Sequence, residues 1–234
     1  EQCGSRYLSL WMADGTNYPG QDDLRARKNR MTASLQEIHE AMPEDSIMLV
    51  EYKLFEPAFY STDIADWGAS RMYCQECGPK AKVLVDLGHH AFGTNIEQIV
   101  AFLVDDEMLG GFHFNSKKYA DDDLTTGSIN PYELYLIFNE LVSAAGGTGL
   151  YDVPYMIDQS HNLKPKVEAM IQSVKTLQET YARALTVDRE TLAEAQEQCD
   201  VVRAEQTIKE AFYTDVSPVV ENAREEMDLD PDPI

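Results

Sequence analysis

The sequence has no apolar run that approaches the roughly 20 residues needed to cross a bilayer, so we expect no membrane span. Its first residues lack the basic start and apolar stretch of a secretory signal. An initiator methionine is missing as well, and we expect a fragment or a processed chain. Positive charge is scarce, because 19 Lys and Arg face 41 Asp and Glu, for a net charge of −22. A chain this acidic repels nucleic-acid backbones and anionic membrane surfaces, so we expect neither as a partner.

Cysteine is scarce too, with four residues in all, and Cys74 and Cys77 have C-x-x-C spacing. No second pair or nearby histidine completes a zinc site. The pair falls in a helix-like segment before Gly78, so we interpret the thiols as structural and reduced, as is typical of the cytoplasm. The apolar share of 44% and charged share of 26% are those of an ordinary globular protein with a buried core.

Short apolar runs alternate along the chain with amphipathic stretches of helical periodicity. This alternation predicts parallel βαβ units. Thr94 is expected to cap the third helix, with Glu97 completing a capping box. We predict strands over residues 6–11, 46–52, 82–86, 109–114 and 153–158, and helices over 22–42, 63–77, 95–104, 130–145, 164–184 and 188–212.

The predicted fold class is α/β, a (β/α)8 TIM barrel present as a partial barrel of about five βα units plus C-terminal helices. We predict that residues 1–162 hold these barrel strands with a metal site, and that residues 163–234 hold the closing barrel helix and a helical extension. Closing the barrel would take about three more strands, which would precede residue 1. We therefore expect the C-terminal part of a longer enzyme, which needs those N-terminal strands and has little activity alone.

Polar side chains stand at the ends of the predicted strands. Parallel strands direct their carboxyl ends to one side of the sheet, which is where barrel enzymes build their active sites. Lys53 is two residues from Glu51 and so points to the same face. The residues expected at this face are Trp11, Glu51, Lys53, Asp86, His89, His113 and Asp158.

Three carboxylates and one imidazole are enough to enclose one divalent ion, and these are Glu51, Asp86, His113 and Asp158. A second, more open set is His89, Asp121 and Asp123, and Asp86 could bridge the two. Such carboxylate-rich coordination without thiolates favours manganese, magnesium or cobalt, with zinc possible. Two plainer interpretations stay open: a solvated acidic loop over residues 121–123, and a salt bridge from Lys53 to a ligand carboxylate.

Four long runs of the sequence match one known family. They are residues 8–20 (LSLWMADGTNYPG), residues 84–91 (LVDLGHHA), residues 110–116 (GGFHFNS) with 118–123 (KYADDD), and residues 155–161 (YMIDQSH). Together they resemble L-rhamnose isomerase of the broad-specificity bacterial type, which belongs to the xylose-isomerase-like barrels. The resemblance covers nearly the whole chain.

The resemblance implies an aldose–ketose isomerase, an intramolecular oxidoreductase that interconverts L-rhamnose and L-rhamnulose, and other aldoses, by a two-metal hydride shift. It implies two divalent ions per site, with manganese favoured over cobalt, magnesium and zinc, and a homotetramer that serves rhamnose catabolism in the cytoplasm. Lys53 would lie near the sugar O1, and Trp11 would form part of the sugar pocket. The structural metal would be held by Glu51, Asp86, His113 and Asp158, and the catalytic metal by His89, Asp121 and Asp123.

Two other classes of function remain open. The first is a metal-dependent epimerase or hydrolase of the same barrel superfamily. Epimerases of that group use one metal and a pair of glutamates, and would need neither Lys53 nor the pair Asp121 and Asp123. A catalytically silent, metal-binding fragment is the other. The sequence assigns no role to His90, to His161 or to the pair Cys74 and Cys77.

Overall fold

The computed structural model describes residues 4–56, 60–159 and 163–234, and the chain divides into two compact units. The first unit comprises Glu1–Asp123 and Val153–Asp158, and the second comprises Leu124–Asp152 and Gln159–Ile234. These boundaries differ from the predicted division between residues 162 and 163, because residues 124–152 carry a helix that packs with the C-terminal helices. The assignment of residues 1–162 to the barrel strands with a metal site, and of residues 163–234 to a barrel helix and a helical extension, stays a prediction.

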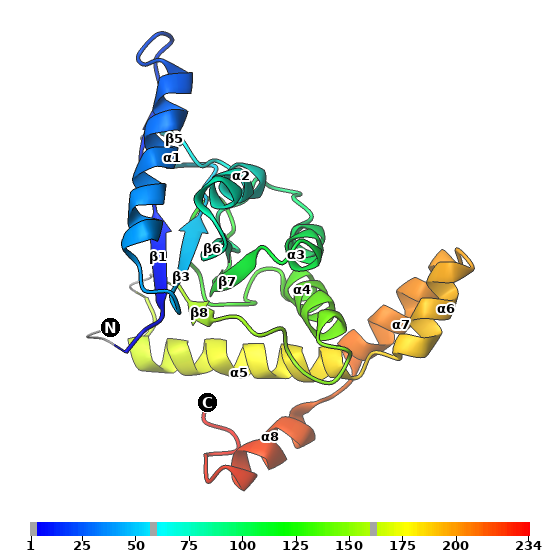
Figure 1. Cartoon of the computed structure of the whole chain (residues 1–234). Coiled ribbons are helices and arrows are strands. Elements are labelled where there is room, and N and C mark those ends of the chain that lie inside the picture. Colours follow the sequence, from blue (N-terminus) through cyan, green and yellow to red (C-terminus); the bar gives the residue numbers. More distant parts are fainter. Residues whose placement is uncertain (1–3, 57–59, 160–162) are drawn as a thin grey trace. The chain divides into compact units, whose positions relative to one another are not determined.

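The first unit is built on a five-stranded parallel sheet with the strand order β1-β3-β6-β7-β8. Figure 1 shows these strands following one another along a curved sheet. All five predicted strands are confirmed, and so is their parallel pairing. The described residues form a partial barrel of this kind rather than a closed one, with β1 and β8 at its two edges. The strands are β1 (Tyr7–Trp11), β3 (Ile47–Glu51), β6 (Ala81–Asp86), β7 (Leu109–Phe114) and β8 (Tyr155–Ile157).

The two strands β3 and β6 are almost continuously apolar and buried. Leu49, Val50, Val83 and Leu84 are each 0% exposed. Runs of this kind are typical of parallel strands that are covered on both faces. Three helices of the same unit lie along one side of the sheet in Figure 1: α1 (Leu24–Ala41), α2 (Trp67–Cys77) and α3 (Ile96–Asp105).

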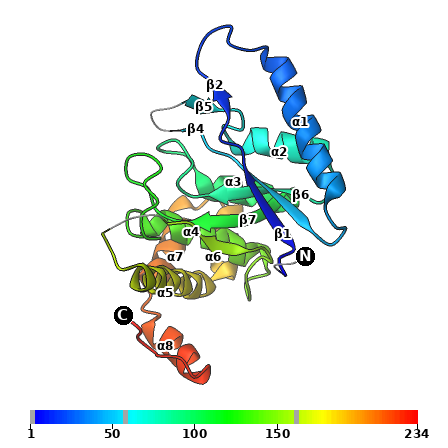
Figure 2. The same cartoon turned by 90° about the vertical axis from the view of Figure 1, so that its left-hand side faces the viewer.

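A small antiparallel sheet in the first unit was not predicted. It has the strand order β2-β5-β4 and is visible in Figure 2. Its strands are β2 (Gly15–Thr16), β4 (Phe55–Glu56) and β5 (Tyr60–Thr62). Strands this short do not show the alternation of apolar and polar residues on which a sequence-based prediction depends.

The second unit contains five helices within its described residues, and α4, α7 and α8 pack against α5. Within the described part of the chain as a whole, no helix is both long and apolar enough to cross a membrane. The helices of this unit are α4 (Pro131–Ala144), α5 (Lys166–Leu185), α6 (Arg189–Glu197), α7 (Val201–Tyr213) and α8 (Ser217–Glu226).

Two details of the predicted helices are wrong. The single helix predicted over residues 188–212 is interrupted between α6 and α7, where Cys199 has a φ of 55° and Asp200 caps α7 by accepting from the Arg203 N–H. The cap of α3 is Asn95 rather than Thr94, because the Asn95 side chain accepts from the backbone N–H of Gln98. Both errors have the same cause. Which residue caps a helix depends on where the backbone leaves the helical conformation, and the sequence offers several capping residues side by side without specifying that point.

The close approach of β6 and β7 at Gly110 gives a test of the sheet packing. A Cβ built on Gly110 would lie 2.5 Å from Lys82 Cβ and 2.7 Å from Leu49 Cδ2. We expect Gly110→Ala to lower the free energy of unfolding by about 1–3 kcal/mol through overpacking, as measured by urea denaturation. In the control Gly149→Ala, the new Cβ meets no described atom within 4 Å, so the change should stay within about 0.5 kcal/mol. Equal stability of the two variants would contradict the packing described for β7.

Candidate metal centre

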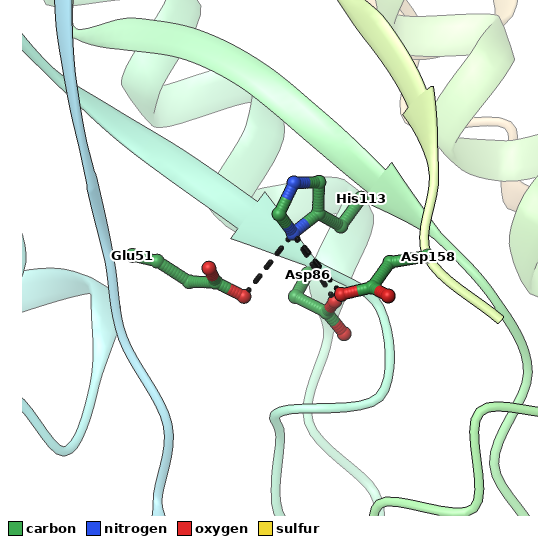
Figure 3. A group of neighbouring side chains, drawn as sticks. All are labelled: Glu51, Asp86, His113 and Asp158. Atoms are coloured by element: carbon green, nitrogen blue, oxygen red, sulfur yellow. Dashed lines mark hydrogen bonds and ion pairs between the residues drawn. The ribbon is translucent and has the colours of Figure 1, made fainter. Parts of the chain in front are cut away.

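Four ligand-type side chains converge where β3, β6, β7 and β8 end. Glu51 and Asp86 are the last residues of their strands, His113 is the last but one of β7, and Asp158 follows β8. His113 Nδ1 lies 3.3 Å from Glu51 Oε1, 3.7 Å from Asp86 Oδ2 and 3.5 Å from Asp158 Oδ2, along the dashed lines of Figure 3. One ligand atom from each of these residues lies within 4.8 Å of the others. The four-residue group (Glu51, Asp86, His113 and Asp158) therefore has the spacing to hold one cation.

The strand register explains this convergence. Asp86 and His113 are direct partners on β6 and β7. The backbone N–H of Asp158 donates to the carbonyl of Phe114 at 3.1 Å, which places Asp158 one step beyond the β7–β8 pairing. Parallel pairing thus brings residues that are far apart in the sequence together at the C-terminal ends of the strands, as predicted.

A second set, the three-residue group, consists of Asp86, His89 and Asp121. His89 Nε2 lies 3.3 Å from Asp121 Oδ1 and 3.9 Å from Asp86 Oδ1. Asp86 belongs to both groups, and its role as a bridge between two metals stays a prediction. The Asp86 side chain is completely buried, so water does not solvate its carboxylate.

Two neighbours orient the Asp86 carboxylate. Asn115 Nδ2 donates to both of its oxygens, at 2.9 and 3.1 Å, and the Gly88 N–H donates to Oδ1 at 2.7 Å. A Cβ at Gly88 would lie 3.0 Å from Asn115 Oδ1 and 3.2 Å from both Asp86 Oδ1 and Asp121 Oδ1, so glycine leaves room for these oxygens. We did not predict a role for Asn115, although it directly follows β7 within a run that matches the isomerase family.

Burial and neighbouring charges shift the pKa values of several side chains in and beside the two groups. Burial raises the pKa of Asp86 to about 6. Burial and the neighbouring charge of Asp121 raise the pKa of Asp123 to about 7. Burial alone would lower the pKa of His89, but Asp121 and the charges of Asp86 and Glu51 raise it to about 9. Protons therefore compensate the carboxylates in the protein alone, and a divalent cation would take over that role.

The residues present fit such a cation. The Oδ1 atom of Asp121 is buried and makes no well-aligned hydrogen bond within the described residues, and its polar neighbour is the His89 Nε2 atom at 3.3 Å. A buried carboxylate oxygen without a well-aligned hydrogen bond is costly, and a cation or water bound to it removes that cost. The ligands are oxygen atoms and imidazoles without thiolates, a set that suits manganese, cobalt, magnesium and zinc.

Asp123 belongs to neither group. Its carboxyl lies next to that of Asp121, and its φ of 45° is in the left-handed region. Its role as a ligand of the catalytic metal stays a prediction.

Lys53 and Trp11 lie together beside the three-residue group. Lys53 is 5% exposed, and its Nζ lies 2.6 Å from Asp121 Oδ2, 2.7 Å from Glu56 Oε2 and 4.8 Å from the centroid of the Trp11 ring. Burial alone would lower the pKa of Lys53, but its hydrogen bonds to Asp121 and Glu56 outweigh burial and raise it. The amine is therefore a fixed positive charge at the site. Glu56 was not predicted, because it reaches Lys53 through the unpredicted strand β4.

A cavity of about 170 Å³ opens beside Lys53 and the three-residue group. Charged groups and aromatic side chains line it together, a combination typical of pockets for small molecules. Its lining includes Lys53, Phe55, His89, Phe92, Tyr119 and Asp121.

The residues to which the sequence assigned no role lie in different places. His90 Nε2 lies 2.6 Å from the Tyr52 phenol oxygen, and burial lowers the pKa of His90 to about 3, so its ring is neutral. Cys74 and Cys77 are on α2 with free thiols and belong to neither metal group. His161 lies outside the described residues.

Comparison with known proteins links the chain to sugar isomerases. The chain is 49% identical over 226 residues to a probable sugar isomerase of Rhizobium meliloti (strain 1021), which is 96% of this chain and 53% of that protein. It is 45% identical over 223 residues to a probable sugar isomerase of Mesorhizobium japonicum, with 94% of this chain and 52% of that protein covered. No protein-family model matches the chain. The homologues support a sugar isomerase-like family, and the chain spans about half their length.

One solved structure supports the fold. The crystal structure of protein SMc04130 from Sinorhizobium meliloti 1021 matches with a TM-score of 0.53 and 13% sequence identity. The match covers 74% of this chain and 64% of the other. At this identity the likeness concerns the fold alone.

Because Asp86 belongs to both groups, Asp86→Asn tests the metal centre. We expect Mn²⁺ to stabilise the unmodified chain by about 2.7 kcal/mol at a concentration of 100 times Kd, reversed by a chelator, and measured as a rise in Tm. Asp86→Asn weakens both groups and should abolish most of this rise. The exposed control Asp152→Asn should keep it. A Tm that does not respond to divalent cations in the unmodified chain would contradict the assignment.

Proposed function

We propose that this chain carries the metal-dependent catalytic half of an aldose–ketose isomerase of the L-rhamnose isomerase type. The observation that carries the proposal is the pair of metal-binding groups that share Asp86, next to the buried, positively charged Lys53. The names of the two homologues support a sugar isomerase. L-rhamnose, the hydride shift and manganese come from the family resemblance of the sequence runs.

Two divalent ions would bind in this proposal, one at the four-residue group and one at the three-residue group with Asp123 nearby. Bound there, they would supply Lewis acidity that polarises the carbonyl and hydroxyl oxygens of an opened sugar. The protein supplies a buried anionic frame, because Glu51 is 4% exposed and Asp86 is 0% exposed. Exclusion of water strengthens every charge interaction inside such a frame.

Lys53 would stabilise the negative charge that develops on the sugar during isomerisation. In the proposed reaction a hydride moves from C2 to C1, and the proton of the C2 hydroxyl is transferred to O1, so that no atom or electron is gained or lost. Because its amine is already protonated and held by Asp121 and Glu56, Lys53 would act as a hydrogen-bond donor to O1 rather than as a base. The Trp11 ring next to it offers an apolar face to the C–H groups of the sugar.

The rest of the active enzyme would come from outside this chain. The homologues are about twice as long as the matched segment, and within the described residues the parallel sheet ends at two edge strands, β1 and β8. We propose that the missing part completes the barrel and the sugar pocket. The homotetramer and the cytoplasmic location stay predictions from the sequence.

Complementation tests this function. With Mn²⁺ and L-rhamnose, the purified chain should produce little or no L-rhamnulose. Co-expression with the part of the Rhizobium meliloti homologue that the chain does not match should restore turnover. Lys53→Met in the reconstituted protein should lower kcat by about 10²–10³.

The matched control for this substitution is Lys209→Met, a partly exposed lysine on α7 that is paired with Glu205. Turnover by the isolated chain would contradict the need for a second part. Unchanged kcat in the Lys53→Met protein would contradict the role of Lys53. An epimerase or hydrolase of the same barrel superfamily would instead bind one metal per site and act on other substrates.

A further inference from the structure

Tyr52 and His90 form a pair to which the proposed function gives no role. Tyr52 is 1% exposed, and its phenol oxygen lies 2.6 Å from His90 Nε2. The two rings meet edge to face, with centroids 5.3 Å apart and planes at 79°. A buried phenol that keeps both its ring packing and its hydrogen bond is held in one orientation.

Each member of the pair adjoins residues of the metal centre in the sequence. Tyr52 stands between Glu51 and Lys53, and His90 follows His89. Successive side chains of an extended segment point to opposite sides. Glu51 and Lys53 therefore face the metal centre, whereas Tyr52 faces His90 on the other side. One hydrogen bond thus joins the end of β3 to the turn that follows β6.

The acceptors around the two histidines fix their hydrogens. His90 Nδ1 lies 3.4 Å from the Leu87 carbonyl, which can only accept, so Nδ1 carries a hydrogen and Nε2 accepts from the Tyr52 O–H. His89 Nδ1 lies 3.0 Å from the Tyr52 carbonyl and therefore donates to it. The nitrogen of His89 left for a cation is Nε2, which is the one that faces Asp86 and Asp121.

We propose that Tyr52 and His90 are positioning residues of the metal centre, an inference that rests on the metal site of the proposed function. The phenol–imidazole hydrogen bond holds the Tyr52 backbone where its carbonyl orients the His89 ring. It also fixes the spacing between Glu51 and Asp86, because the two residues of the pair belong to the same two segments. Outer partners of this kind determine ligand orientation and, through it, metal affinity.

Titration with Mn²⁺, followed by the EPR signal of the unbound ion, tests the pair on the full chain. Tyr52→Phe removes the phenol oxygen and keeps the ring, and His90→Leu removes the acceptor. We expect each to weaken binding at the three-residue group by about tenfold. The double variant should be no weaker than either single variant, since both remove one interaction. His90→Gln retains an acceptor near the Nε2 position and should bind closer to the unmodified chain.

The matched control is Tyr135→Phe. The Tyr135 hydroxyl donates to the Ile208 carbonyl at 2.9 Å, and Tyr135 is 0% exposed, so its loss also removes a buried phenol hydrogen bond. This variant should keep the Mn²⁺ affinity of the unmodified chain. Circular dichroism checks that each variant is folded, and if His90→Leu is not, Tyr52→Phe against His90→Gln decides.

Two results would overturn the inference, and they are distinguishable. Affinity in Tyr52→Phe equal to that of the folded Tyr135→Phe control would remove the positioning role and leave the metal centre intact. Failure of the unmodified chain to bind Mn²⁺ would overturn the metal centre and, with it, the role of the pair.

Discussion

The carboxylate of Asp86 is the group on which the rest of the site depends. It is fully buried, yet it lies within ligand distance of two separate sets of side chains and takes hydrogen bonds from Asn115 and Gly88. A buried charge is tolerated when it is paired and hydrogen-bonded. A proton on His89 compensates part of the charge, and divalent cations would take over this role. The fold thus places, at the end of β6, a set of side chains that could bind a divalent cation.

Much of this arrangement could be predicted from the sequence, for a physical reason. Apolar runs followed by helical periodicity specify parallel strands, and parallel strands place their carboxyl ends together. Glu51, Asp86, His113 and Asp158 are therefore brought together by topology alone, whatever the detailed packing.

The rest depends on contacts that sequence patterns do not carry. Glu56 reaches Lys53 from a strand of two residues, too short to show a period. Asn115 and Tyr52 act through neighbours far away in the sequence. The break after α6 depends on a single residue with positive φ, Cys199, which composition does not mark. Asp123, which the sequence suggested as a ligand, lies outside both groups, and its role stays a prediction.

The account predicts two cations on one shared carboxylate, and anomalous diffraction from crystals of the chain grown with Mn²⁺ tests this directly. We expect two anomalous peaks, one among Glu51, Asp86, His113 and Asp158 and the other among Asp86, His89 and Asp121. A difference map with no peak at Asp86, or with manganese bound solely to surface carboxylates elsewhere, would contradict the central claim.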